Sequence, residues 1–200
     1  MRVIAGSAKG RALKAVPGKN TRPTTDKVKE AIFSMIGPYF DGGWVLDLFA
    51  GTGGLGIEAL SRGAERAVFI DMEKASIDVV RHNATEAGVA DKAEIYRNEA
   101  GRAVKALAKR GSAFRYVFLD PPYRMKEMDG VMAQLAESGL LEPGAVVVVE
   151  HDAEHQYPET AVPFEQTKRV KYGDTAVTIY RYRPEADAAV RTEREEQMEE

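Results

Sequence analysis

The middle of this chain alternates short apolar stretches with longer segments whose apolar residues recur at helical spacing. Each apolar stretch has the length of a buried strand. The predicted strands are 44–49, 67–70, 93–97, 116–119 and 145–149, and the predicted helices between them are 55–61, 74–86, 100–109 and 127–138. This alternation predicts a parallel sheet covered by helices on both faces.

The two ends of the chain depart from this alternation. Residues 164–172 and 175–182 each show the alternation of side chains that is typical of a strand. The tight turn Gly173-Asp174 lies between them, which predicts an antiparallel hairpin. Residues 2–5 and 11–16 predict two short strands, and a helix capped by Thr24 or Thr25 follows them. The predicted fold is α/β, with a seven-stranded, mostly parallel sheet that ends in an antiparallel hairpin, and with a small N-terminal β-hairpin/helix extension.

Composition removes several classes of protein. The 200 residues include no cysteine, so disulfides, cysteine-ligated metals and a cysteine nucleophile are excluded. The longest strongly apolar run, 145–149, is far shorter than the ~18 residues of a membrane span. The N-terminus lacks the apolar core of a signal peptide. We therefore expect a cytoplasmic protein without a membrane partner.

Charge is unevenly distributed, although the whole chain carries a net charge of only −3. Residues 1–40 hold eight basic and two acidic residues, whereas residues 184–200 hold seven acidic and two basic ones. We predict a basic, RNA-binding extension over 1–40, a catalytic domain over 41–183 and an acidic, flexible tail over 184–200. A basic extension favours an anionic partner such as nucleic acid, and chance clustering on a solvated surface is the alternative.

A glycine-rich turn follows the first predicted strand, from Asp47 to Gly56. Glycine allows a ligand to approach the backbone closely, and the next helix offers free N–H groups. The turn lacks the Lys-Ser/Thr of a phosphate-binding P-loop. Asp71, 18 residues after Gly53, ends the next strand, where an acid is placed to bind two ribose hydroxyls. Together they predict a nucleoside site, and the acid at Asp47 favours a cationic ligand such as S-adenosylmethionine over a dinucleotide.

Asp120-Pro121-Pro122-Tyr123 follows the fourth predicted strand. Ligands of open parallel sheets bind beyond the carboxyl ends of the strands. The two prolines remove backbone donors, which leaves the Asp120 carboxylate and the Pro121 carbonyl as acceptors. Two rigid acceptors beside an aromatic ring suit the exocyclic amine of a flat base. A plain Pro-Pro turn with an aspartate cap is the alternative.

These motifs, with Arg22-Pro23-Thr24-Thr25-Asp26-Lys27-Val28-Lys29-Glu30 and residues 55–64, resemble a known family. The chain is similar over 1–183 to the small bacterial 16S rRNA guanine-N(2)-methyltransferases, which are class I S-adenosylmethionine-dependent enzymes. The resemblance implies a Rossmann-like methyltransferase fold and methylation of a guanine amine without a metal. It also implies 16S rRNA or an assembling small ribosomal subunit as the partner, and we expect a monomer.

The resemblance assigns roles to individual residues. The segment Asp120, Pro121, Pro122 and Tyr123 is the catalytic clamp on the target base. Lys9, Arg11, Arg22 and Thr24 are the expected substrate-binding residues. Glu99 stands where the wider fold usually has an aspartate that contacts the adenine amine, and its side chain is one methylene longer. The expected cofactor-binding residues are Asp47, Phe49, Ala50, Gly51, Thr52, Gly53, Gly56, Asp71, Glu99 and Ala100.

Three alternatives stay open. The same clamp serves an adenine-N(6) methyltransferase on DNA or RNA. A protein glutamine methyltransferase typically has asparagine where Asp120 stands. A non-catalytic RNA-binding module for ribosome assembly is the third. The histidines form no metal pattern. His151 follows the fifth strand at its carboxyl end, where it could line the site, and we favour a structural role for it.

Overall fold

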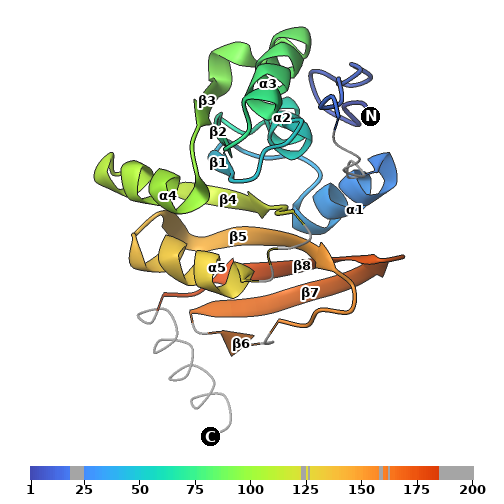
Figure 1. The fold of residues 1–200 in the computed structure, drawn as a ribbon. Helices are drawn as coiled ribbons and strands as arrows, with labels where there is room; N and C mark the ends of the chain where they lie inside the picture. The colour runs from blue at the N-terminus through green and yellow to red at the C-terminus, as the bar shows by residue number, and fades with distance from the viewer. Residues whose placement is uncertain (19–24, 123–124, 126, 158–159, 162, 185–200) are drawn as a thin grey trace, which may run out of the picture.

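The computed structural model describes residues 1–18, 25–122, 125, 127–157, 160–161 and 163–184. Within this part of the chain, eight strands form one sheet in the order β3-β2-β1-β4-β5-β8-β7-β6 (Figure 1). The strands are β1 Trp44–Asp47, β2 Arg66–Asp71, β3 Ala93–Arg97, β4 Phe114–Leu119, β5 Leu141–Asp152, β6 Thr160–Ala161, β7 Phe164–Tyr172 and β8 Thr175–Tyr182. Strands β1 to β5 are parallel, as predicted, and β8 joins β5 antiparallel.

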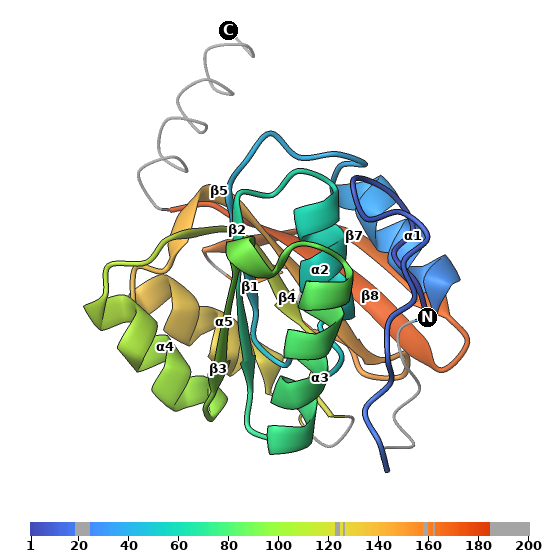
Figure 2. The ribbon, with the colours of Figure 1, turned by 90° about the horizontal axis from the view of Figure 1, so that it is seen from above.

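Helices cover both faces of this sheet (Figure 2). They are α1 Asp26–Ile36, α2 Gly54–Ser61, α3 Lys74–Glu86, α4 Ala100–Lys109 and α5 Met128–Glu137, with a 3₁₀ turn over Ala90–Lys92. Because side chains alternate along a strand, Val45 and Phe118 pack beneath α1–α3, whereas Leu46 and Val117 pack beneath α4 and α5. The sheet therefore separates two apolar cores, which confirms the predicted Rossmann-like arrangement.

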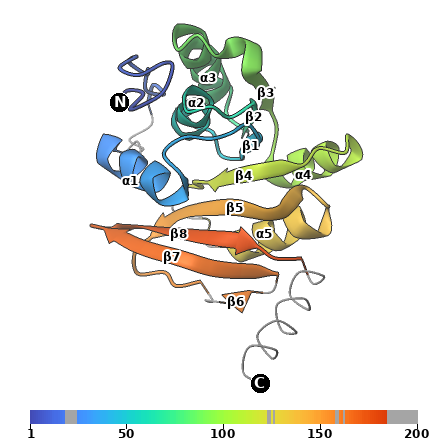
Figure 3. The ribbon, with the colours of Figure 1, turned by 180° about the vertical axis from the view of Figure 1, so that it is seen from behind.

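The C-terminal hairpin is confirmed, and β6 adds an eighth, two-residue strand to the predicted seven. Gly173 has a φ of 61° in the turn between β7 and β8, a conformation that favours glycine. The hairpin extends the sheet on the side away from β1–β3 (Figure 3). The sheet thus has a parallel half and an antiparallel half, which meet between β5 and β8.

Strand β5 is longer than the predicted 145–149. It begins at Leu141, and the pairing of β4 with β5 shifts register between Phe114 and Tyr116. Gly144 has a φ of 76° at this irregularity. A bulge accommodates Pro143-Gly144 inside the strand, although such a pair indicates a turn in sequence.

The N-terminal extension requires a correction. The predicted strands at 2–5 and 11–16 are reduced to one antiparallel bridge between Arg2 and Ala12. Some backbone N–H groups of this segment donate to side chains of α2 and not to a neighbouring strand. Glu58 accepts the N–H groups of Ile4 and Ala5, and Ser61 accepts that of Ala8. Residues 1–16 therefore pack on α2 as an irregular arm, hereafter called the N-terminal arm.

Helix α1 begins where predicted. Thr25 is its N-cap, and the hydroxyl oxygen of Thr25 accepts the N–H of Val28. Gly37, with a φ of 125°, ends the helix. No helix in the described ranges combines the length and the apolar character that crossing a bilayer requires. The predicted tail over 184–200 lies, apart from Pro184, outside the described residues.

Candidate functional site

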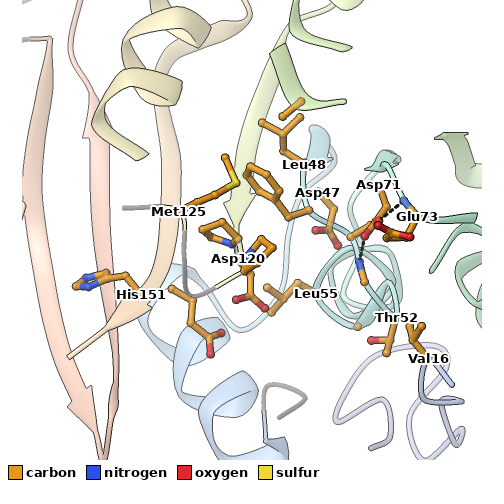
Figure 4. A pocket seen from close by; sticks show the side chains of 18 of the residues that line it. Val16, Asp47, Leu48, Thr52, Leu55, Asp71, Glu73, Asp120, Met125 and His151 are labelled. Atoms are coloured by element: carbon orange, nitrogen blue, oxygen red, sulfur yellow. Dashed lines mark hydrogen bonds between the residues drawn. The ribbon is translucent and has the colours of Figure 1, made fainter. Parts of the chain in front are cut away.

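A cleft of about 640 Å³ opens where the parallel strands end (Figure 4). This volume is in the range of small-molecule sites. Its walls come from the glycine-rich turn after β1, the end of β2, the start of α4, the segment after β4 and the end of β5. Met1, Ala15, Val16 and Lys29 add a wall from the N-terminal arm and α1. The cleft lies at the edge of the sheet where the sequence predicts ligand binding.

The turn after β1 forms one wall of the cleft. Gly51 and Gly53 have φ angles of 54° and 77°, which favour glycine. A Cβ on Gly56 would lie 2.3 Å from the Phe69 ring, so glycine there lets α2 pack directly on β2. Phe49, Ala50, Gly51 and Thr52 line the cleft, whereas Gly53 and Gly56 act behind it by shaping the turn.

Asp71 fixes this turn from the end of β2. One carboxylate oxygen accepts the N–H of Gly51 at 2.9 Å, and the other accepts the N–H of Glu73 at 2.9 Å. Figure 4 shows the Asp71 carboxylate beside the turn. Two backbone donors therefore orient the carboxylate that is predicted to bind ribose, and the ribose contact itself stays a prediction.

Asp47 is buried beneath the turn, with a relative exposure of 2%. One oxygen accepts the N–H of Gly56 at 3.0 Å. Burial raises the pKa of Asp47 to about 7, and the charge of Asp71 adds to this, whereas the Gly56 hydrogen bond lowers it. The ionised form is therefore stabilised by a positively charged ligand in the cleft.

Asp120, Pro121 and Pro122 follow β4 and line the same cleft. Figure 4 shows the Asp120 carboxylate pointing into the space between the β1 turn and β5. The Pro122 carbonyl accepts the N–H of Met125 at 2.9 Å. Three predicted site residues, Tyr123, Arg22 and Thr24, lie outside the described residues.

Glu99 and the basic residues of the arm lie away from the cleft lining. Both oxygens of Glu99 accept N–H groups at the start of α4, from Gly101 and Arg102, and these hydrogen bonds lower the pKa of Glu99. Its neighbour Ala100 lines the cleft, as predicted. The adenine contact of Glu99 stays a prediction, as do the RNA contacts of Lys9 and Arg11, which are exposed on the arm.

At the end of β5, sequence reasoning considered His151 alone and missed the other residues of the wall. Glu150, His151, Asp152, His155 and Tyr157 line the cleft. His151 also has the predicted structural role, because its Nε2 lies 2.8 Å from the Thr178 hydroxyl, and burial lowers its pKa. The rule that ligands lie at the carboxyl ends of strands points to His151 in the sequence, and the same rule is a signal for Glu150 and Asp152 beside it.

The polar groups of the cleft fit S-adenosylmethionine. Asp71 offers carboxylate oxygens to hydroxyl groups, the glycine turn lets a ligand approach the backbone, and Asp47 favours a cation. A pyrophosphate, in contrast, is repelled by the two aspartates. The fold and these residues define a class I S-adenosylmethionine-dependent methyltransferase.

Comparison with known proteins agrees with this class. A family model described as "Conserved hypothetical protein 95" matches residues 1–181. The chain is 52% identical over 183 residues to "Putative rRNA methyltransferase YlbH" of Bacillus subtilis (strain 168), covering 92% of this chain and 100% of that protein. It is 34% identical to "Ribosomal RNA small subunit methyltransferase D" of Escherichia coli (strain K12), covering 90% and 89% of the two chains. The chain therefore belongs to the "Conserved hypothetical protein 95" family.

Solved structures share the architecture. The structure described as "Putative methyltransferase yhhF from Escherichia coli" has a TM-score of 0.78 and 32% identity, and covers 92% of this chain and 98% of that chain. An RNA methyltransferase from Salinibacter ruber in complex with S-adenosyl-L-homocysteine has a TM-score of 0.61 at 23% identity, over 80% and 94% of the two chains. The second likeness concerns the fold alone.

Proposed function

We propose that this protein transfers a methyl group from S-adenosylmethionine to the N(2) amine of a guanine in 16S rRNA. The observation that carries the proposal is the position of Asp120-Pro121-Pro122, which opens on the same cleft as the glycine turn and Asp71. A target amine held by Asp120 therefore shares one enclosed space with the cofactor. The names of two relatives specify rRNA, and one specifies the small subunit.

The chemistry requires alignment more than activation by a metal. S-adenosylmethionine supplies an electrophilic methyl group when it is bound. The guanine amine is a weak nucleophile because its lone pair is conjugated with the ring. The Asp120 carboxylate and the Pro121 carbonyl accept hydrogen bonds from the two N–H groups of this amine. These hydrogen bonds turn the nitrogen lone pair toward the methyl group, and they stabilise the positive charge that develops on the nitrogen.

The N-terminal arm is proposed to hold the RNA. Lys9 and Arg11 are exposed on it, while Met1 and Val16 of the same arm line the cleft. The arm thus extends from the C-terminal end of α2, where Ala8 bonds Ser61, to the cleft, and an rRNA strand bound along the arm would reach the opening. Phosphate contacts of this kind position a substrate without reading its sequence.

Labelled methyl transfer tests the proposal. Purified protein is incubated with radioactive S-adenosylmethionine and, separately, with unmodified 16S rRNA, assembled small subunits and DNA, and the products are digested to nucleosides. We expect label in N(2)-methylguanosine from 16S rRNA or the subunit. Label in N(6)-methyladenosine would instead favour the adenine-specific alternative, and binding without transfer would favour a non-catalytic assembly role.

A further inference from the structure

Glu150 lies beside Asp120 at the carboxyl edge of the sheet. Strands β4 and β5 run parallel, and their last paired residues are Leu119 and Val149. Asp120 and Glu150 each come directly after this pair. They therefore occupy neighbouring positions on adjacent strands, which lie about 4.8 Å apart in a sheet.

Both side chains belong to the same face of the sheet. Two residues earlier, Phe118 and Val148 pack in the core beneath α1–α3, whereas Leu119 and Val149 pack in the opposite core. Continued alternation places Asp120 and Glu150 on the face of Phe118 and Val148. Both residues line the cleft, so two acceptor groups stand side by side at its wall.

The backbone of Glu150 is held more firmly than that of Asp120. Glu150 is within β5 and pairs with Val177 of β8, and this pairing continues to Asp152. Asp120 lies just beyond the last residue of β4. Because β8 pairs with β5 at Glu150, the position of the Glu150 backbone is fixed before a ligand binds. A side chain held in this way is well suited to discriminate between ligands.

Guanine and adenine differ at the atom next to the relevant amine. On guanine, the N1–H lies beside the N(2) amine, so the edge presents donors at adjacent positions. On adenine, N1 has no proton, so an acceptor lies beside the N(6) amine. Because ionised carboxylates only accept hydrogen bonds, two neighbouring carboxylates match the guanine edge and repel the adenine edge.

We propose that Glu150 selects guanine, by accepting its N1–H while Asp120 and the Pro121 carbonyl hold the N(2) amine. The proposal rests on the proposed function and adds to it the group that specifies the base. Glu150 is thus a specificity-determining residue that touches the substrate, whereas the clamp at Asp120 serves any exocyclic amine.

The first test uses the wild-type protein and an altered base. The guanine that the labelling experiment identifies is replaced by 2-aminopurine in 16S rRNA ligated from a synthetic fragment. This base keeps the amine, but its N1 carries no proton. We expect single-turnover methylation to slow by about 10- to 100-fold, the range for a lost hydrogen bond to a charged group. Equal rates would overturn the role of Glu150 and leave the proposed function intact, whereas no methylation of the guanine RNA would refute the proposed function itself.

The second test assigns the discrimination to Glu150. In Glu150→Gln the amide also offers an N–H, which can face the bare N1 of 2-aminopurine. The ratio of guanine to 2-aminopurine rates should narrow by at least about tenfold, while cofactor affinity stays near wild type. Glu154→Gln is the matched control, because the Glu154 side chain is 86% exposed and outside the cleft lining, and it should keep the wild-type ratio. An unchanged ratio in Glu150→Gln would contradict the proposal.

Discussion

Two carboxylates are buried close to the cleft, Glu58 in α2 and Asp47 at the end of β1. Glu58 accepts the N–H groups of Ile4 and Ala5 at 2.9 and 3.0 Å. It also pairs with Arg62 at 2.8 Å and with Lys29 at 3.3 Å. Asp47, by contrast, accepts a hydrogen bond from one backbone donor in the described part of the chain, the N–H of Gly56.

We propose that the difference separates a structural charge, Glu58, from one that binds a ligand, Asp47. The protein compensates Glu58 with two cations and two N–H groups, so this carboxylate ties the N-terminal arm and α1 to α2. Burial raises the pKa of Asp47 to about 7, and no cation among the described residues forms an ion pair with it. A buried group whose protonation is so easily changed is typical of functional sites.

Removing the charge of Glu58 should have the largest effect on the stability of the protein. Glu58→Gln keeps an acceptor for the arm but leaves Lys29 and Arg62 as buried, unpaired cations. We expect unfolding to become easier by about 3–5 kcal/mol, measured by urea denaturation. Glu142→Gln, which breaks the exposed pair with Arg115, should cost about 0–1 kcal/mol. Equal losses in the two variants would contradict the structural role of Glu58.

The pH dependence of stability should reveal Asp47. Its folded pKa of about 7 lies above the ordinary value of 3.8, so between these values the folded chain holds the extra proton. The stability that this proton contributes is present at low pH and is lost as pH rises through 7. From pH 5 to 8 the ligand-free wild type should lose about 2–3 kcal/mol relative to Asp47→Asn. Urea unfolding at both pH values measures this difference, and parallel profiles for the two proteins would contradict it.

A substitution of Asp71 tests whether the carboxylates at the ends of β1 and β2 form the predicted cofactor site. Asp71→Ala removes the predicted ribose acceptor together with the hydrogen bonds to Gly51 and Glu73. Affinity for S-adenosylmethionine should fall by about ten- to a hundredfold, because hydrogen bonds to charged groups contribute about 1.5–3 kcal/mol. Calorimetry measures the affinity, and Asp78→Ala on the exposed side of α3 serves as the control. Wild-type affinity in a folded Asp71→Ala protein would remove Asp71 from the site.

The smallest effect concerns the arm that Glu58 anchors. Replacing Lys9, Arg11 and Lys14 by alanine should reduce the slope of log affinity for RNA against log salt by about 2. Cofactor affinity should not change. The control replaces three exposed basic residues of α4, on the opposite face of the sheet: Arg102, Lys105 and Lys109. The same salt slope in the arm variant and the wild type would show that the arm is not the RNA contact.

Sequence patterns predicted the parts of the fold whose signals are local. The parallel strands appear as apolar runs, and Asp47, Asp71 and Asp120 each follow or end one. The start of β5 at Leu141 was not predicted, because Pro143-Gly144 lies within the strand. A bulge inside a strand and a turn between elements use the same residue types.

The missed features depend on contacts between distant segments. Nothing local indicates that Glu58 replaces a strand partner for the arm, or that Lys29 is buried against it. Likewise, the position of Glu150 beside Asp120 follows only from the register of β5 on β4, which sequence does not specify.

The most direct measurement of the central claim is single-turnover methylation of 16S rRNA by Asp120→Ala, with cofactor and RNA saturating. Asp120 is assigned to the target amine, so calorimetric affinity for S-adenosylmethionine should stay near that of the wild type. The rate should fall by about a hundredfold or more, as when one preorganised hydrogen-bonding group is lost from a transition state. A wild-type rate in this variant would contradict the clamp at the end of β4, and with it the proposal that this cleft methylates an amine.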